Sequence, residues 1–255
     1  MAIDILTIPC RSDNYAFLIH ESETGETALV DAPEAAPLLA ALDERGWTLS
    51  TILLTHHHDD HIEGVPDLLA RHDAKVIGAK ADAHRLPPLD QQVADGDRLT
   101  ICGTEVEVWD VSGHTVGHIA FVMPGAKAAF TADSLMALGC GRVFEGTMPM
   151  MWDSLSKFAG LPDDTMIYSG HEYTAANAKF ALSVDPDNPD LKARARVIDE
   201  IRRQGGFTVP SLLGEERKTN PFLRASDPEM KQRLGMDNAP DSEVFGEIRQ
   251  RKDRF

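Results

Sequence analysis

A run of histidines and aspartates directly after an apolar segment constrains this chain more than any other feature. Residues 55–61 read Thr-His-His-His-Asp-Asp-His, so seven residues contain four of the ten histidines. The segment before them, residues 51–54, has the apolar and β-branched composition of a buried strand. Imidazole and carboxylate groups bind metals, and a tetrahedral zinc ion takes about four such ligands, or three with a water. The run therefore predicts a metal site at the end of a strand.

The spacing divides this run into two pairs of ligands. Alternate side chains of an extended segment lie on one face, so His56 and His58 can point at one ion. Asp60 and His61 follow where the chain turns, and they can point at a second ion roughly 3.5–4 Å from the first. His57 and Asp59 need not bind metal. The alternative is a solvated histidine-rich tract, but the run is internal and lies between ordered patterns.

Three later segments each place a further metal-binding side chain after an apolar run. These side chains are His114 in Ser-Gly-His-Thr, Asp133 in Phe-Thr-Ala-Asp and His171 in Tyr-Ser-Gly-His-Glu. A rigid scaffold presents functional groups on loops at the ends of its strands. A single histidine is a weak signal, whereas the ordered series is specific.

The periodicity of apolar residues predicts strands first and helices later. Strands are expected at residues 3–8, 15–20, 27–31, 51–54, 105–108, 119–123 and 128–130, and a helix at residues 34–45 that ends at Gly46. From about residue 172 on, helices are expected at residues 173–183, 189–203 and 242–254. We therefore predict an α/β (α+β) fold in which helices cover two packed sheets, followed by a helical part.

Composition excludes several classes of function. The net charge of −16 disfavours binding to nucleic acid and therefore a nuclease. The sequence has no apolar run of ~18 residues and no signal-peptide pattern, which predicts a soluble cytoplasmic protein without membrane contact. Three cysteines leave one unpaired in any disulfide scheme, which suits reduced thiols. We interpret Cys140 as a small buried residue near the site rather than a ligand, and we expect a monomer.

Taken together, these motifs resemble those of the glyoxalase II (hydroxyacylglutathione hydrolase) family within the metallo-β-lactamase superfamily. The similarity extends over nearly the whole chain and includes, besides the histidine run, Asp13-Asn14-Tyr15, Gly139-Cys140-Gly141-Arg142, Phe144-Glu145-Gly146-Thr147, Gly170-His171-Glu172-Tyr173, Asn220-Pro221-Phe222, and Arg249 with Lys252-Asp253. The resemblance implies an αββα sandwich. It also implies a catalytic domain at residues 1–171 and a helical glutathione-binding domain at residues 172–255.

The resemblance assigns a role to each candidate ligand. Metal one would be held by His56, His58, His114 and Asp133, and metal two by Asp60, His61, His171 and Asp133. Asp133 would bridge the two ions, and Asp60 and Asp133 would be the catalytic carboxylates beside a bridging hydroxide. Two divalent cations are implied. Zinc is the favoured identity, and histidine with carboxylate also accepts iron or manganese.

The reaction implied is hydrolysis of S-D-lactoylglutathione, and of related S-2-hydroxyacylglutathiones, to glutathione and D-lactate. This is the second step of methylglyoxal detoxification. A metal lowers the pKa of bound water from 15.7 to about 7, so hydroxide is available at neutral pH. The thiol that leaves has a pKa near 8.5 and can depart as an anion. A thioester therefore suits the site better than an amide does.

Five positions match contacts of the family with glutathione. They are Arg142, Phe144, Tyr173, Arg249 and Lys252. Cations suit the carboxylates of glutathione, although a basic helix end that complements the helix dipole is an alternative from composition alone. Phe144 replaces the tyrosine of some members, which removes a hydroxyl and predicts weaker binding of glutathione.

Other functions within the superfamily differ at identifiable positions. A persulfide dioxygenase uses one iron and has a different segment after the Gly-Cys-Gly-Arg turn, where residues 143–146 follow the hydrolase pattern. A β-lactamase usually replaces the bridging aspartate and lacks the helical extension. A lactonase and a nuclease are further enzyme alternatives. A metal-buffering protein is the non-enzyme alternative.

Overall fold

The computed structural model describes residues 3–255, which form two units. The first contains the described residues up to Val111 together with Val116–Ala132. The second contains Ser112–Thr115 and Asp133–Phe255. These units reflect packing, and the functional division between residues 171 and 172 stays a prediction.

The first unit begins with a six-stranded sheet whose strands follow one another in chain order. β1 and β2 form an antiparallel hairpin and β2 pairs antiparallel with β3, whereas β3 to β6 are parallel neighbours. The parallel connections require crossovers, which the helices after β3 and β4 supply. The strands are β1 (Ile3–Cys10), β2 (Asn14–Glu21), β3 (Thr27–Val30), β4 (Leu49–Leu53), β5 (Lys75–Ala79) and β6 (Gln91–Val93).

Four antiparallel strands of a second sheet also belong to this unit and pack on one face of the first sheet. They are β7 (Arg98–Ile101), β8 (Thr104–Asp110), β9 (Ile119–Met123) and β10 (Ala128–Ala132). The ring centroids of Phe17 on β2 and Phe130 on β10 lie 5.7 Å apart, so side chains of the two sheets meet. All residues of β9 and β10 are buried, as predicted.

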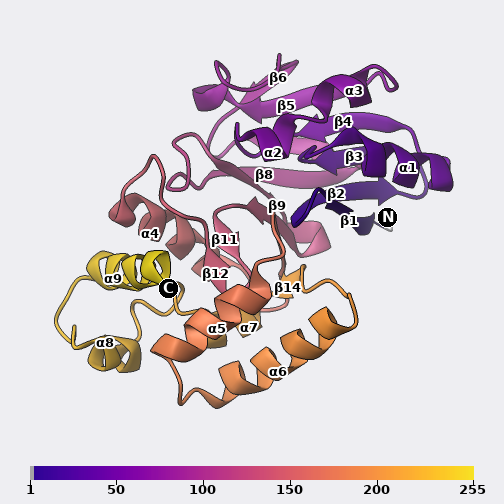
Figure 1. Ribbon diagram of the computed structural model, residues 1–255. Helices are drawn as coiled ribbons and strands as arrows, with labels where there is room; N and C mark the ends of the chain where they lie inside the picture. The colour runs from indigo at the N-terminus through magenta and orange to yellow at the C-terminus, as the bar shows by residue number, and fades with distance from the viewer. Residues whose placement is uncertain (1–2) are drawn as a thin grey trace. The chain divides into compact units, whose positions relative to one another are not determined.

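Helices cover the opposite face of the first sheet (Figure 1). They are α1 (Ala35–Arg45), α2 (Asp59–Ile62) and α3 (Val65–Leu69). Single 3-10 turns follow β5 at Lys80–Asp82 and connect β9 to β10 at Pro124–Ala126. Leu38 and Leu42 of α1 share a core cluster with Leu18 and Ile52 of the sheet. α1 ends at Gly46, whose φ of 67° is the left-handed conformation that glycine adopts most easily. The predicted helix and its end are confirmed.

The second unit consists mainly of helices. Its elements are β11 (Leu135–Met136), β12 (Gly139–Cys140), α4 (Met148–Lys157), a 3-10 turn at Phe158–Gly160, β13 (Met166–Ser169), α5 (Thr174–Val184), α6 (Pro189–Arg203), β14 (Ser211–Leu212), α7 (Leu213–Thr219), α8 (Pro228–Leu234) and α9 (Asp241–Arg254). Ala178 and Ala181 of α5 pack with Leu191 and Ile198 of α6. Trp152 of α4 lies 6.2 Å from Phe245 of α9 between ring centroids.

The predicted C-terminal helices are confirmed at residues 173–183, 189–203 and 242–254 to within a residue or two. Helix α4 was not predicted. None of the described helices is both long and apolar enough to cross a membrane.

Candidate metal centre

Four predicted ligands of the first unit lie where β4 gives way to α2. His56 and His61 are fully buried, while His58 and Asp60 are half-buried. His56 Nε2 and His58 Nδ1 lie 3.2 Å apart. Two nitrogens that bind one tetrahedral zinc at 2.0–2.1 Å are about 3.3 Å apart. The separation of the two imidazoles is therefore compatible with a common ion.

Asp31, at the end of β3, fixes the orientation of two of these histidines. Its Oδ2 lies 2.8 Å from His61 Nδ1 and accepts from the Thr55 hydroxyl at 2.8 Å. Its Oδ1 accepts from the Thr55 backbone N–H at 2.9 Å. The Thr55 hydroxyl lies 3.0 Å from His56 Nδ1, for which it serves as acceptor. Both Nδ1 atoms therefore carry the proton, which leaves Nε2 of each ring to bind metal.

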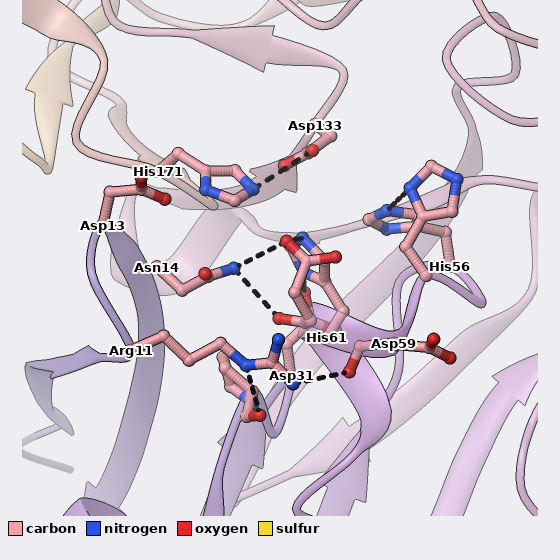
Figure 2. A network of polar contacts seen from close by, with 12 residues as sticks. Arg11, Asp13, Asn14, Asp31, His56, Asp59, His61, Asp133 and His171 are labelled. Atoms are coloured by element: carbon pink, nitrogen blue, oxygen red, sulfur yellow. Dashed lines mark hydrogen bonds and ion pairs between the residues drawn. The ribbon is translucent and has the colours of Figure 1, made fainter.

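The loop between β1 and β2 holds Asp60. Asn14 Nδ2 donates to Asp60 Oδ2 and to the Asp60 carbonyl, each at 3.0 Å (Figure 2). Arg11 has a φ of 50° and donates to the carbonyl of Pro33 at 2.9 Å. Its backbone N–H donates to the carboxylate of Glu34, and its guanidinium pairs with the carboxylate of Glu63. The Asp13-Asn14-Tyr15 motif thus contributes a side chain that orients a predicted ligand.

His57 points toward a buried carboxylate rather than toward the other histidines. Its Nδ1 lies 2.9 Å from Oδ2 of Asp82, which is fully buried. Arg85 pairs with the same carboxylate and donates to the Val116 carbonyl at 2.8 Å. His57 therefore anchors the histidine run to the neighbouring segments of this unit.

The second unit contains the other three predicted ligands. Asp133 Oδ2 lies 3.4 Å from His114 Nε2. It also lies 3.3 Å from His171 Nε2 (Figure 2). These separations again match those of ligand atoms around a shared ion. His114 Nδ1 donates to the Arg142 carbonyl at 2.7 Å, which leaves its Nε2 to bind metal. One carboxylate oxygen therefore lies between two imidazoles, as a bridging ligand requires.

Gly141 packs directly against this donor set. A Cβ at this position would lie 1.9 Å from the Asp133 carbonyl oxygen and 3.0 Å from His114 Nδ1. Gly141→Ala is therefore expected to lower the free energy of unfolding by about 2 kcal/mol through overpacking. Thermal unfolding measures this loss. Gly160→Ala is the matched control, since a Cβ there meets nothing within 4 Å. Equal melting temperatures of the two variants would contradict the prediction.

The five predicted substrate contacts all lie in the second unit. Phe144 is 61% exposed and its ring centroid lies 5.3 Å from that of His114. Arg142 lies over the Phe144 ring, and Tyr173 stacks on His171 with centroids 4.7 Å apart. Lys252 is half-buried, and its pKa is lowered below the usual range. Burial is the main cause, and repulsion from the nearby charge of Arg249 adds to it. Arg249 is buried.

The three cysteines are free, as predicted, and all are buried, which was predicted for Cys140 alone. Burial raises the pKa of Cys10 and Cys102 to about 12 and that of Cys140 to about 11, and Arg249 opposes the rise at Cys140. A raised pKa lowers the thiolate fraction at neutral pH, and the thiolate is the reactive form. We therefore expect no labelling of the native protein by a thiol reagent at neutral pH, and labelling of all three after denaturation. Rapid labelling of the folded protein would contradict this.

Comparison with known proteins decides the family. The model described as "Metallo-beta-lactamase superfamily" matches residues 12–171, and the model described as "Hydroxyacylglutathione hydrolase C-terminus" matches residues 172–255. A hydroxyacylglutathione hydrolase from Ruegeria pomeroyi is 63% identical over 255 residues, which cover 100% of both chains. The chain belongs to the hydroxyacylglutathione hydrolase family. A member from Rhizobium meliloti is 51% identical over 254 residues, covering 100% of this chain and 99% of that one.

Solved structures agree on the fold. A B3 metallo-β-lactamase, BLEG-1, aligns with a TM-score of 0.67 at 20% identity, covering 86% of this chain and 99% of that one. ETHE1 from Myxococcus xanthus aligns with a TM-score of 0.63 at 24% identity over 100% of both chains. The predicted fold class and family are confirmed. As a family member the chain is a hydrolase, and its histidine and aspartate donors are compatible with two metal ions.

Sequence reasoning missed three residues that orient side chains of the histidine run. Asp31 and Asp82 were not singled out, and Asn14 was quoted in a motif without a role. Asp31 carried one usable signal, because an aspartate directly after an apolar strand often marks a functional loop. Asp82 lies in a segment without a comparable pattern.

Proposed function

We propose that this hydrolase cleaves the thioester bond of S-2-hydroxyacylglutathiones, with S-D-lactoylglutathione as the substrate that yields glutathione and D-lactate. This is the second step of methylglyoxal detoxification. The observation that carries the proposal is the full-length identity to hydroxyacylglutathione hydrolases. The orientation of the histidines in both units supports it further.

The proposed centre holds two divalent metal ions, with zinc favoured and iron or manganese as alternatives. His56, His58 and His114 would hold metal one, and Asp60, His61 and His171 would hold metal two. Asp133 would bridge them. The fit rests on two features: donor atoms 3.2 to 3.4 Å apart within each unit, and hydrogen bonds that leave Nε2 of His56, His61 and His114 to bind metal.

The reaction forms a bond between the carbonyl carbon and the oxygen of water, and it breaks the bond between that carbon and sulfur. When bound, the ions supply an activated water and polarise the carbonyl. Asp31 and Arg142 keep the imidazoles in the required orientation, and Asn14 does the same for Asp60. The glutathione thiolate leaves without an acid, because its pKa is near 8.5.

The proposed glutathione contacts are Arg142, Phe144, Tyr173, Arg249 and Lys252. Cationic side chains suit the carboxylates of the tripeptide. Phe144 offers an exposed ring beside His114 but no hydroxyl, which predicts weaker binding than a tyrosine would give. We place these contacts in a domain of residues 172–255 together with the loop that carries Arg142 and Phe144.

A hydrolysis assay with purified protein tests this function. Thioester loss from S-D-lactoylglutathione should be fast, should stop after exhaustive chelation and should return when zinc is added back. A β-lactam and a glutathione persulfide serve as rival substrates. Consumption of either rival while lactoylglutathione persists would refute the proposed substrate, and unchanged turnover after chelation would refute the metal centre.

We further propose that the protein acts as a monomer in the cytoplasm. Its three free, buried cysteines suit a reducing compartment. Sedimentation at working concentration tests the oligomeric state, and cell fractionation tests the location.

A further inference from the structure

One short segment of the second unit connects two of the predicted ligands. It begins at Asp133 and ends at Arg142, whose carbonyl accepts from His114 Nδ1 at 2.7 Å. Near the two ends of this segment, the Gly141 N–H donates to the Ser134 carbonyl at 3.1 Å. This bond joins the two ends of the segment. We call residues 139–142 the Cys140 loop.

The turn that precedes the Cys140 loop is held by buried side chains of the C-terminal helices. Leu138 has a φ of 54° although it is fully buried and not a glycine. Such backbone persists where the surroundings over-determine it. The carboxylate of Glu216 accepts from the Leu138 N–H at 2.8 Å, and Asn177 donates to the Ala137 carbonyl at 3.0 Å.

The Asn-Pro-Phe motif acts on the same turn. Asn220 Nδ2 donates to the carbonyl of Met136 at 3.1 Å and to that of Gly139 at 3.0 Å. Phe222 of the same motif lies under the guanidinium of Arg249, with 5.1 Å from Cζ to the ring centroid. Two motifs that stand far apart in the sequence thus meet at the Cys140 loop.

Arg249 makes the direct contact with this loop. Its side chain is 6% exposed, and its Nη1 donates to the Cys140 carbonyl at 3.0 Å. Its Nη2 donates to Asp253 Oδ1 at 2.9 Å. A planar guanidinium with these two acceptors and a ring beneath it has little freedom to move. The carbonyl that it holds belongs to the residue next to Gly141.

We infer that Arg249 is a positioning residue for the metal centre. Through the Cys140 carbonyl it fixes the loop that packs on Asp133 and accepts from His114. The inference rests on the proposed function, because it concerns the ligands of the proposed centre. It adds to Arg249 a role that is independent of any contact with glutathione.

Lys252 provides a matched comparison on the same helix. Its Nζ donates to the Ala176 carbonyl at 3.3 Å and lies 5.3 Å from the ring centroid of Phe180. Lys252 and Arg249 are both proposed partners of the glutathione carboxylates. Loss of either cation should weaken substrate binding, but only the loss of Arg249 should disturb the ligands.

The decisive measurement is the zinc affinity of the metal-free protein, determined by competition with a chromophoric chelator and without substrate. Arg249→Ala is expected to weaken zinc binding about 10- to 100-fold, the usual effect of losing an outer-shell partner. Lys252→Ala should leave zinc affinity unchanged. With zinc at saturation, Lys252→Ala should chiefly raise KM, whereas Arg249→Ala should also lower kcat.

Two further variants complete the test of the role of Arg249. Arg249→Lys retains the cation but not the fork that joins two acceptors, so it should recover part of KM and little of the zinc affinity. Asp253→Ala removes the second acceptor of Arg249, and also the acceptor of Arg142 Nε, at a position that is 31% exposed. Like Arg249→Ala, this variant should weaken zinc binding. It takes the place of Arg249→Ala in the test if circular dichroism shows that Arg249→Ala is unfolded.

The inference would be overturned if Arg249→Ala bound zinc as tightly as the wild type. The same holds for Asp253→Ala where it replaces Arg249→Ala in the test. Arg249 would then be a substrate contact only. The proposed function is tested separately by the wild type. A wild-type protein that binds no zinc but hydrolyses the thioester would overturn the centre, and this inference with it.

Discussion

Asp133→Ala is expected to reduce kcat/KM for S-D-lactoylglutathione more than about 100-fold. One oxygen of this carboxylate lies 3.4 Å from His114 Nε2 and 3.3 Å from His171 Nε2. Its removal would leave two imidazoles without the ligand that joins them. Loss of even an outer-shell partner typically costs 10–100-fold, so loss of a bridging ligand should exceed that range. Steady-state kinetics and elemental analysis on one preparation measure both effects.

A surface aspartate supplies the control for this variant. Asp187 is 77% exposed and pairs with Arg233, and an exposed ion pair contributes about 0–1 kcal/mol. Asp187→Ala should therefore retain metal content and turnover. If Asp133→Ala retained both as well, the bridging role would be wrong.

Asp31→Asn is expected to weaken zinc binding about 10- to 100-fold without removing any ligand. The amide of asparagine has one N–H₂ group and can adopt two orientations. In one, its N–H₂ group faces the N–H of His61 Nδ1, and in the other it faces the backbone N–H of Thr55, so two donors meet in either case. Facing His61, the amide favours the tautomer whose proton is on Nε2, which then cannot bind metal. Facing Thr55, it leaves a buried donor unpaired. Chelator competition measures the loss of affinity.

Asp43→Asn is the corresponding control in the same unit. Asp43 lies on α1 with a side chain 62% exposed, and it pairs with Arg71 at 3.4 Å. The same chemical change at this position should leave zinc affinity unchanged. The tautomer argument would be refuted by an Asp31→Asn variant whose zinc affinity equals that of Asp43→Asn.

The sequence predicted most of the fold because its helices and strands carry strong periodic patterns. The helix expected at residues 189–203 is found at Pro189–Arg203, and the one expected at 242–254 at Asp241–Arg254. The spacing of the histidines also predicted how their side chains lie relative to one another. Its alternate residues His56 and His58 bring two nitrogens to 3.2 Å because the segment is extended.

The elements that sequence reasoning missed are short or weakly patterned. Helix α4 begins at Met148 with a proline in its first turn, and the Thr147 hydroxyl accepts from the Met150 N–H at 3.3 Å. A threonine cap with a proline in the first turn is a start signal for a helix, so this helix was the exception and could have been predicted. Strands such as β6 have only three residues, too few for a period to appear.

The contacts that the orienting residues of the site make could not be predicted from the sequence, for a different reason. Asp31 reaches His61 across 30 positions of sequence, and Arg249 reaches Cys140 across 109. No local pattern encodes such contacts, because they exist only after the chain has folded. The resemblance pointed to Arg249 as a cation for carboxylates, but it could not reveal that the guanidinium is buried.

The turn at Met136–Gly139 has a consequence for protein engineering by recombination. Asn177, Glu216 and Asn220 satisfy the backbone of that turn, and all three come from later in the chain. A chimera of two family members joined at residue 171 would separate the turn from the side chains that evolved with it. A crossover just before Asp133 would inherit turn and helices from the same parent, and we expect such chimeras to be the ones that load metal.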